Sequence, residues 1–240
     1  MSAPEKAEFD KHAAGYDGGL DNPIKRLIGS SPDDYIAVKA RWLLRREKAL
    51  RGGSLSLLDY GCGAGDLMRV LASLGARASF TGCDVSSGML AEAARRWPGG
   101  PEVAPTLVVQ DGARTPFADS QFDVATVSAV LHHVPLAERP AVYAELGRVL
   151  KPGGRLYVFE HNPRNPLVRH VIARTPIDEN AILLDANEVQ AGLLDSARYE
   201  VETDYLMFMP PGIKFLRGVD RALAWLPLGA QYAVAALKPL

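Results

Sequence analysis

The residues that could do chemistry in this sequence gather around a glycine-rich loop, Gly61–Gly65. The loop follows an apolar run that ends in Asp59, and a helical pattern begins after it at Asp66. A strand, a glycine loop and a helix in this order open a nucleotide-binding βαβ unit, in which glycine lets the backbone approach a ligand closely. The spacing therefore predicts a small-molecule site at the carboxyl end of this strand.

The acidic residues around the loop restrict the ligand that it can hold. A dinucleotide-binding loop has its third glycine at the position of Asp66, where a carboxylate would repel a pyrophosphate at the helix N-terminus. The Gly-Lys-Ser/Thr of a phosphate-binding loop is missing, and Asp59 adds a second negative charge. These features favour a ligand with ribose and positive charge but no phosphate, a description that S-adenosylmethionine fits.

Four motifs together resemble one enzyme family. The segment Asp59–Gly65 is similar to the first motif of class I S-adenosylmethionine-dependent methyltransferases. Phe-Asp at 122–123, Leu-His-His-Val at 131–134 and Arg-Val-Leu-Lys-Pro-Gly-Gly at 148–154 follow in the family's order. The resemblance covers roughly residues 55–161 and points to the small-molecule branch, similar to methyltransferase types 11 and 12 and to quinone C-methyltransferases. It implies S-adenosyl-L-methionine as the cofactor and methyl transfer as the reaction.

Strand and helix patterns alternate along the chain and predict an α/β fold. We expect strands at residues 55–60, 78–83, 106–110, 121–127, 155–160, 199–206 and 230–237. Such alternation gives a parallel, doubly wound sheet with right-handed crossovers. The resemblance implies a Rossmann-like, seven-stranded sheet in the order 3-2-1-4-5-7-6, with strand 7 antiparallel.

We expect a single domain over residues 1–240, with three parts. Residues 1–53 form an N-terminal helical cap, 54–161 the cofactor-binding core, and 162–240 the substrate lid insertions and a C-terminal hairpin. The two insertions, 162–184 and 207–229, are long for connections in a compact domain and too apolar for disorder. We interpret both as a substrate lid.

Acids at the ends of the second and third strands suit the two halves of an adenosine. Asp84 stands where an acid can accept both ribose hydroxyls, although an Asp at this place can also cap a helix. Asp111 suits the adenine amino group in the resembling enzymes, and Met89 faces the adenine side. The full set that we assign to the cofactor is Tyr16, Asp59, Gly61, Gly63, Asp84, Val85, Met89, Asp111, Gly112, Ala113 and Ser128.

The N-terminal part of the chain offers further candidate contacts to the cofactor. The resemblance implies that Tyr16 covers the cofactor, since Phe9, Asp10, Ala13 and Tyr16 match a spacing that such enzymes use; a loosely ordered terminus is the alternative. Lys39 or Arg41 could reach the carboxylate of the methionine group, but a solvated helix face is the commoner role for such residues.

Methyl transfer requires alignment of the reactants and exclusion of water, and a general base only when the acceptor must lose a proton. The candidate bases at the strand ends are His132, His133, Glu160 and His161, with Tyr16 and Tyr35 weaker. Strand alternation should let only one of His132 and His133 face the acceptor. We predict His133 and His161 as catalytic residues. No residues show metal-ligand spacing, so we expect no metal.

Composition limits the partners. The chain has 240 residues, 48% of them hydrophobic, and a net charge of −1, which leaves no basic footprint for nucleic acid or an acidic membrane. We see no signal peptide, and the longest uncharged run, 222–237, falls short of a spanning helix. We therefore expect a cytoplasmic enzyme with a small-molecule acceptor and no nucleic-acid or membrane partner. Monomer and homodimer remain open.

The lid composition indicates the acceptor. Met207–Pro211, Phe215–Leu216 and Trp225–Pro227 are apolar, and Arg164, Arg169 or Arg174 could anchor one anionic group. We expect O-, N- or C-methylation of a mainly apolar or aromatic molecule in the biosynthesis of a secondary metabolite. The alternatives are a catalytically silent S-adenosylmethionine-binding module and, disfavoured by the acids around the loop, a nicotinamide-dependent oxidoreductase.

Overall fold

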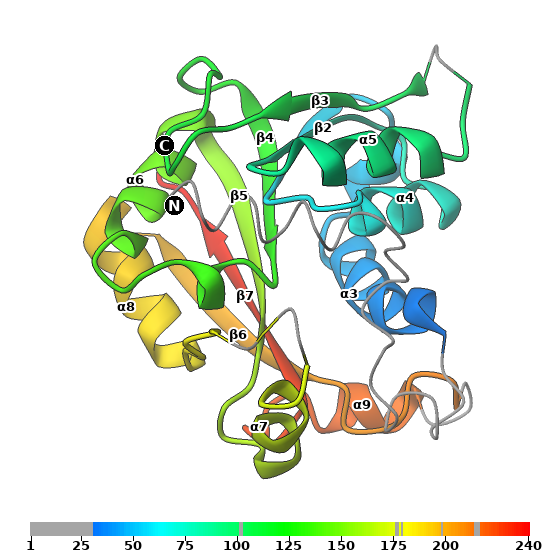
Figure 1. Cartoon of the computed structure of the whole chain (residues 1–240), viewed down its shortest axis with the longest axis vertical. Coiled ribbons are helices and arrows are strands. Elements are labelled where there is room, and N and C mark those ends of the chain that lie inside the picture. Colours follow the sequence, from blue (N-terminus) through cyan, green and yellow to red (C-terminus); the bar gives the residue numbers. More distant parts are fainter. Residues whose placement is uncertain (1–30, 101–102, 176–177, 179, 198, 214–216) are drawn as a thin grey trace.

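A seven-stranded sheet forms the centre of the molecule. The computed structural model describes residues 31–100, 103–175, 178, 180–197, 199–213 and 217–240 (Figure 1). The strands are β1 (Leu55–Tyr60), β2 (Ala78–Asp84), β3 (Thr106–Val109), β4 (Phe122–Ser128), β5 (Leu150–His161), β6 (Glu200–Leu206) and β7 (Gln231–Leu237). Their order is β3-β2-β1-β4-β5-β7-β6, and β7 runs antiparallel to both of its neighbours. This confirms the predicted fold, order and direction.

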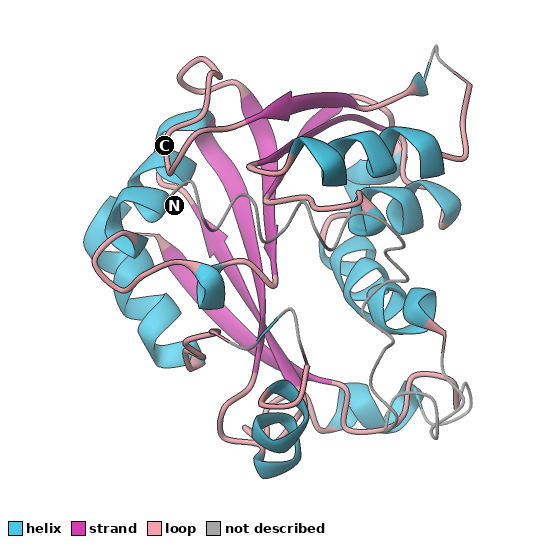
Figure 2. Cartoon of the chain, in the orientation of Figure 1, coloured by secondary structure: helices cyan, strands magenta, loops and turns pink. Residues whose placement is uncertain are grey.

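Helices cover both faces of the sheet (Figure 2). Figure 1 shows α3, α4 and α5 on one side and α6 and α8 on the other, while α7 and α9 lie together at one end. The bounds are α3 Pro32–Arg46, η1 Lys48–Arg51, α4 Asp66–Ser73, α5 Ser87–Arg96, η3 Leu131–His133, α6 Arg139–Val149, α7 Pro166–Ile172, α8 Ala186–Ala197 and α9 Arg217–Ala222. Two buried clusters result, one on each face of the sheet.

Helix α3 is held by a cap at its N-terminus and by contacts of Trp42 with the sheet. A capping box begins it, because Ser31 and Asp34 each accept a backbone hydrogen bond from the other residue. Farther along, the indole of Trp42 donates to Asp204 on β6 at 2.7 Å and packs edge-on against Phe159 of β5. The helix therefore lies across the antiparallel part of the sheet and presents its middle to the ends of the parallel strands.

The fifth strand is longer than predicted. It begins at Leu150 instead of 155, and the Lys-Pro-Gly-Gly segment lies inside it as an irregularity in its pairing with β4. Gly153 takes a φ of 72°, a left-handed conformation that glycine adopts without steric cost. The strand bends there without ending.

The two insertions of the expected lid are joined to each other. Asn162 donates from its side-chain amide to the carbonyls of Pro227 at 3.2 Å and Gly229 at 2.8 Å. Asn165, which also caps α7, donates to the carbonyl of Leu228 at 2.8 Å. We call these three hydrogen bonds the asparagine clamp. Within the described residues, no helix is both long and apolar enough to cross a bilayer.

Candidate active site

A cavity of about 380 Å³ opens at the carboxyl ends of β1, β2 and β4. Its wall is formed by the glycine loop, by α3, by residues 129–133 after β4, which we call the histidine segment, and by α7. The predicted cofactor residues that line it are Asp59, Gly61, Gly63, Asp84, Val85, Met89 and Ser128. The crevice therefore lies where open α/β sheets bind their ligands.

The other predicted cofactor residues fall elsewhere. Asp111, Gly112 and Ala113 are not part of the cavity wall, and Asp111 is exposed, whereas Gln110 just before them lines it. Tyr16 lies outside the described residues. The strand pattern gave the right end of β3 but could not fix which side chain of the following turn points inward.

The glycine loop needs glycine at its first position for a steric reason. Gly61 has a φ of 67°, and a Cβ built on it would lie 2.6 Å from a methyl carbon of Val130. Gly63 has a φ of 51°, but a Cβ there would meet nothing within 4 Å, since the residue borders the open cavity. The first glycine thus allows close packing against the histidine segment, and the second leaves room for a ligand.

Alanine substitutions should separate these two roles. Gly61→Ala should lower the free energy of unfolding by about 2–4 kcal/mol, from left-handed strain and overpacking. Gly63→Ala should cost only the strain, about 1–2 kcal/mol, and should mainly weaken ligand binding. Denaturant unfolding and calorimetry measure the two effects. Equal destabilisation by both substitutions would contradict this account.

Asp84 braces the loop. One carboxylate oxygen accepts the amide N–H of Gly63 at 2.8 Å and the other accepts that of Ser86 at 2.9 Å. Ser86, and not Asp84, caps α5, since its hydroxyl accepts from the amide of Met89 at 3.0 Å. Asp84 also lines the cavity, so its carboxylate both holds the loop and borders the space for a ligand.

Two ionisable side chains, those of Asp59 and Lys39, line the cavity together with the glycine loop. Asp59 is 2% exposed and accepts the hydroxyl of Thr126 at 2.7 Å. Burial raises the pKa of Asp59 to about 7, against the opposing effects of Thr126 and of the charge on Lys39. Lys39 is 3% exposed and donates to the hydroxyl of Ser128 at 3.0 Å. The expectation of a solvated Lys39 is wrong, because the docking of α3 on the sheet encloses this side chain.

The buried carboxyl of Asp59 should make the stability of the ligand-free protein depend on pH. Its pKa of about 7 lies above the ordinary 3.8, so the folded state holds the proton more tightly. The free energy of unfolding relative to Asp59→Asn should therefore fall as the pH rises from 3.8 to about 7 and should level off above that. Denaturant unfolding of both proteins across this range measures the difference, and a constant difference would contradict the shift.

A second charged cluster lies farther along the cavity. His132 Nδ1 lies 2.5 Å from one oxygen of Glu160, and the other oxygen accepts the backbone N–H groups of Val130 and Leu131 at 3.0 and 2.7 Å. Burial opposes charge on both partners. Even so, His132 lowers the pKa of Glu160 to about 2, and Glu160 with Asp178 raises the pKa of His132 to about 9.

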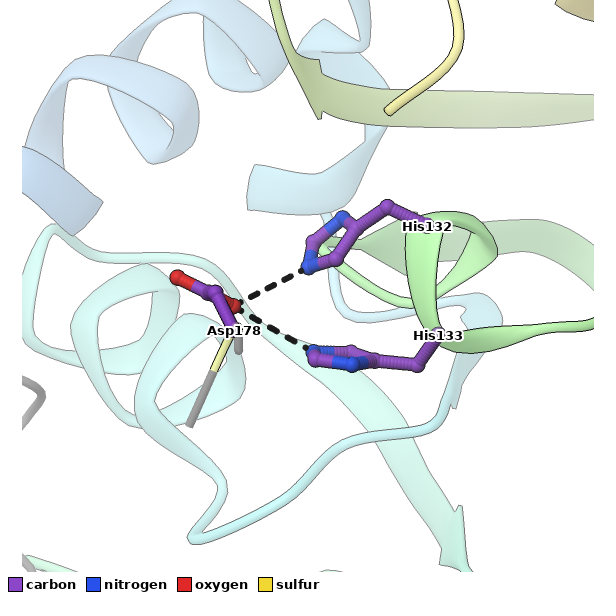
Figure 3. A group of neighbouring side chains, drawn as sticks. All are labelled: His132, His133 and Asp178. Carbon is purple, nitrogen blue, oxygen red and sulfur yellow. Dashed lines mark ion pairs between the residues drawn. The ribbon is translucent and has the colours of Figure 1, made fainter. Parts of the chain in front are cut away.

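Asp178 joins this cluster from the first insertion (Figure 3). One of its oxygens lies 3.4 Å from Nε2 of His132 and 3.4 Å from Nε2 of His133. Both residues line the cavity, although the side chain of His132 is 1% exposed and that of His133 16%; that only one of them faces the acceptor stays a prediction. Both line it because the chain turns into the short helix η3 here, so the strand alternation no longer applies.

Asp178 is the residue that sequence reasoning missed. It lies in a segment broken by prolines, far from the histidines in sequence, and no periodic pattern marks it. The expectation of no metal rested on the same lack of spacing. The structure instead brings potential ligand atoms of His132, His133 and Asp178 within 4.8 Å of one another.

His161 lines the same part of the cavity. Its ring centroid lies 5.4 Å from that of His132. Burial, followed by the charge on His132, lowers the pKa of His161 to about 3, so this ring is neutral. It keeps some accessible surface because one side faces the cavity.

The apolar wall comes from an unexpected part of the lid. Leu167, Val168, Val171 and Ile172 of α7 line the cavity. Of the segment Met207–Pro211, only Met207 does so; most of the rest lines a second cavity, of about 500 Å³, between α3 and α9. Trp225 is 74% exposed. In the described residues, the apolar surface predicted for the second insertion thus largely faces away from this site, while Phe215 and Leu216 lie outside the described residues.

Comparisons with known proteins agree with this geometry. Residues 58–158 match the family described as a methyltransferase domain. The chain is 40% identical over 175 residues to the demethylmenaquinone methyltransferase of Thermobifida fusca, covering 68% of this chain and 69% of that protein. It is 38% identical over 119 residues to the 2-phytyl-1,4-naphtoquinone methyltransferase of Synechococcus elongatus, covering 47% of this chain and 49% of that protein. The chain thus spans about half the length of that second relative.

A solved structure shows the same fold. The PH0226 protein of Pyrococcus horikoshii superposes with a TM-score of 0.64 at 17% identity, covering 96% of this chain and 99% of that one.

Proposed function

We propose, because this chain belongs to the class I S-adenosylmethionine-dependent methyltransferases, that it transfers a methyl group from S-adenosyl-L-methionine to a small molecule. The observation that carries this is one cavity that joins the Asp59 and Lys39 charges to the histidine cluster. The two relatives named for naphthoquinone and menaquinone substrates support a quinone-type ring in the acceptor. We place the methyl group on O, N or C and the reaction in the biosynthesis of a secondary metabolite.

The residues of the cavity wall around the glycine loop, which we call the first half of the cavity, fit the cofactor. The acid and the base that meet there, Asp59 and Lys39, match the ammonium and carboxylate of an amino acid. The open space over Gly63 leaves room for the ligand, and the carboxylate of Asp84 in the cavity wall suits ribose hydroxyls. When bound, S-adenosylmethionine supplies a methyl group on a positively charged sulfur.

The adenine ring of the cofactor would lie near the carboxyl end of β3. The contacts expected of Asp111, Gly112 and Ala113 stay predictions, and Gln110 is an additional candidate because it lines the cavity.

The residues of the second half would hold the acceptor. The apolar side chains of α7 exclude water, and alignment of two reactants in such a space can lower a barrier by about 7–11 kcal/mol. We propose that His133 and His161 act as the catalytic residues on the acceptor, since both residues line the cavity. His132, which is 1% exposed and bonded to Glu160, positions His133 and Asp178.

The test is calorimetry followed by an acceptor screen. We expect micromolar binding of S-adenosylmethionine and of its demethylated product, and transfer of a labelled methyl group to quinone-type or aromatic acceptors. Binding without transfer to any of these would favour the silent module. Tight NADH binding without S-adenosylmethionine binding would favour an oxidoreductase. The cytoplasmic location, the lack of nucleic-acid and membrane partners, and the choice between monomer and homodimer stay predictions.

Asp84→Ala should weaken cofactor binding by about 1–3 kcal/mol, because a charged acceptor for the ribose hydroxyls is lost. That loss corresponds to roughly 5–150-fold in affinity. Asp84→Asn, which keeps the shape and one acceptor oxygen, should lose less. Calorimetry on folded variants measures both, and unchanged affinity in Asp84→Ala would place the ribose elsewhere.

A further inference from the structure

We propose that His132, His133 and Asp178 bind one divalent transition-metal cation, such as Zn²⁺, at the acceptor end of the cavity. The inference deepens the proposed function, on which its role in methyl transfer rests. It also narrows the acceptor to aromatic molecules that carry a hydroxyl group on the ring, as hydroquinones do.

The distances suit a cation better than direct hydrogen bonds. One oxygen of Asp178 lies 3.4 Å from Nε2 of each histidine, longer than a normal N–H···O bond of about 2.7–3.2 Å. Ligand atoms around a tetrahedral Zn²⁺, at bond lengths of about 2.0–2.1 Å, lie about 3.3–3.4 Å apart. All three ligand atoms lie within 4.8 Å of one another.

The first histidine already has the outer partner that metal-binding histidines use. Nδ1 of His132 is bonded to Glu160, which directs Nε2 toward Asp178 (Figure 3). Two backbone N–H groups hold the carboxylate of Glu160 in turn. A carboxylate on the far ring nitrogen fixes the tautomer and orientation of a metal-ligating histidine.

Charge and access also favour a cation. Glu160 and Asp178 bring two carboxyl groups to the histidine rings in a site where these residues are only 1% and 9% exposed. A divalent cation neutralises them, whereas unpaired buried charge is costly. Three protein ligands leave a fourth position open, as in catalytic zinc sites, and all three residues line the cavity.

An oxygen of the acceptor would take the fourth position. Binding to the cation lowers the pKa of a ring hydroxyl, whose proton passes to water while the electron pair stays on the acceptor. That pair forms the new bond to the methyl carbon as the carbon–sulfur bond breaks, and the electrons of the broken bond go to sulfur. The step needs no oxidant or reductant.

Metal binding can be measured without activity. The full-length protein, stripped with a chelator, should bind one Co²⁺ per chain with the visible absorption bands of a four-coordinate site, and Zn²⁺ should displace it. His133→Ala and the nearly isosteric Asp178→Asn should each weaken this binding at least about 10–100-fold. His170→Ala, on the exposed face of α7, should leave it unchanged. Circular dichroism melts confirm that each variant is folded.

Cofactor binding to the same stripped protein separates this inference from the proposed function. S-adenosylmethionine binding without stoichiometric Co²⁺ binding overturns the metal site and leaves the methyltransferase proposal intact. Co²⁺ binding without cofactor binding does the reverse. Co²⁺ affinity that survives in both His133→Ala and Asp178→Asn would overturn the assignment of these ligands.

Discussion

Glu160→Ala should lower the free energy of unfolding by about 3–5 kcal/mol, the range for removing one partner of a buried ion pair. His132 would remain 1% exposed with its Nδ1 unpaired, and the N–H groups of Val130 and Leu131 would lose their acceptor. Denaturant unfolding in the presence of a chelator measures the loss without a contribution from bound metal.

A surface acid provides the matched control for Glu160. Glu202 pairs with Arg46 at 2.6 Å, but its side chain is 71% exposed. Glu202→Ala should therefore change stability by about 1 kcal/mol or less, since exposed ion pairs contribute little. A loss in Glu160→Ala no greater than that in Glu202→Ala would show that His132 does not depend on its carboxylate partner.

His133→Ala should lower kcat by roughly 10²–10³-fold, the effect of removing one polar group aimed at the reacting atoms. The side chain of His133 is 16% exposed and borders the cavity, so its loss should leave the core intact. Steady-state kinetics with an acceptor found in the screen measures this effect.

Two controls test whether the loss of kcat in His133→Ala comes from the reaction itself. Calorimetry should show unchanged S-adenosylmethionine affinity, because the residues proposed for the cofactor, such as Asp59 and Asp84, belong to the glycine-loop side of the cavity wall. His170→Ala, which removes an exposed histidine of α7, should retain wild-type kcat. Turnover within tenfold of wild type in His133→Ala would remove His133 from the reaction.

Local patterns explain why the fold and the cofactor half could be predicted. Asp59 and Asp84 lie at the carboxyl ends of β1 and β2, and the glycine loop follows β1. The carboxyl ends of neighbouring parallel strands lie at one edge of the sheet. Their place therefore follows from the chain order and the right-handed crossovers. Three helix N-caps are likewise visible from local sequence spacing: Ser31 of α3, Ser86 of α5 and Asp185 of α8.

The acceptor half could not be predicted in the same way, because long-range packing decides it. Lys39 is enclosed only because Trp42 docks α3 on Asp204, a residue far along the chain. Asp178 reaches the histidines through an irregular segment, where neither periodicity nor capping signals give a direction. Such contacts depend on how separate elements meet, which a single sequence does not encode locally.

The asparagine clamp has a consequence for how the enzyme turns over. Its three hydrogen bonds, from Asn162 and Asn165, join the insertion that carries α7 to the one that carries α9. Each such bond contributes about 0.5–1.5 kcal/mol, so separating the insertions would cost several times the thermal energy. We therefore expect the two insertions to move as one unit, so that a lid formed by them would admit the acceptor and release the methylated product in a single opening motion.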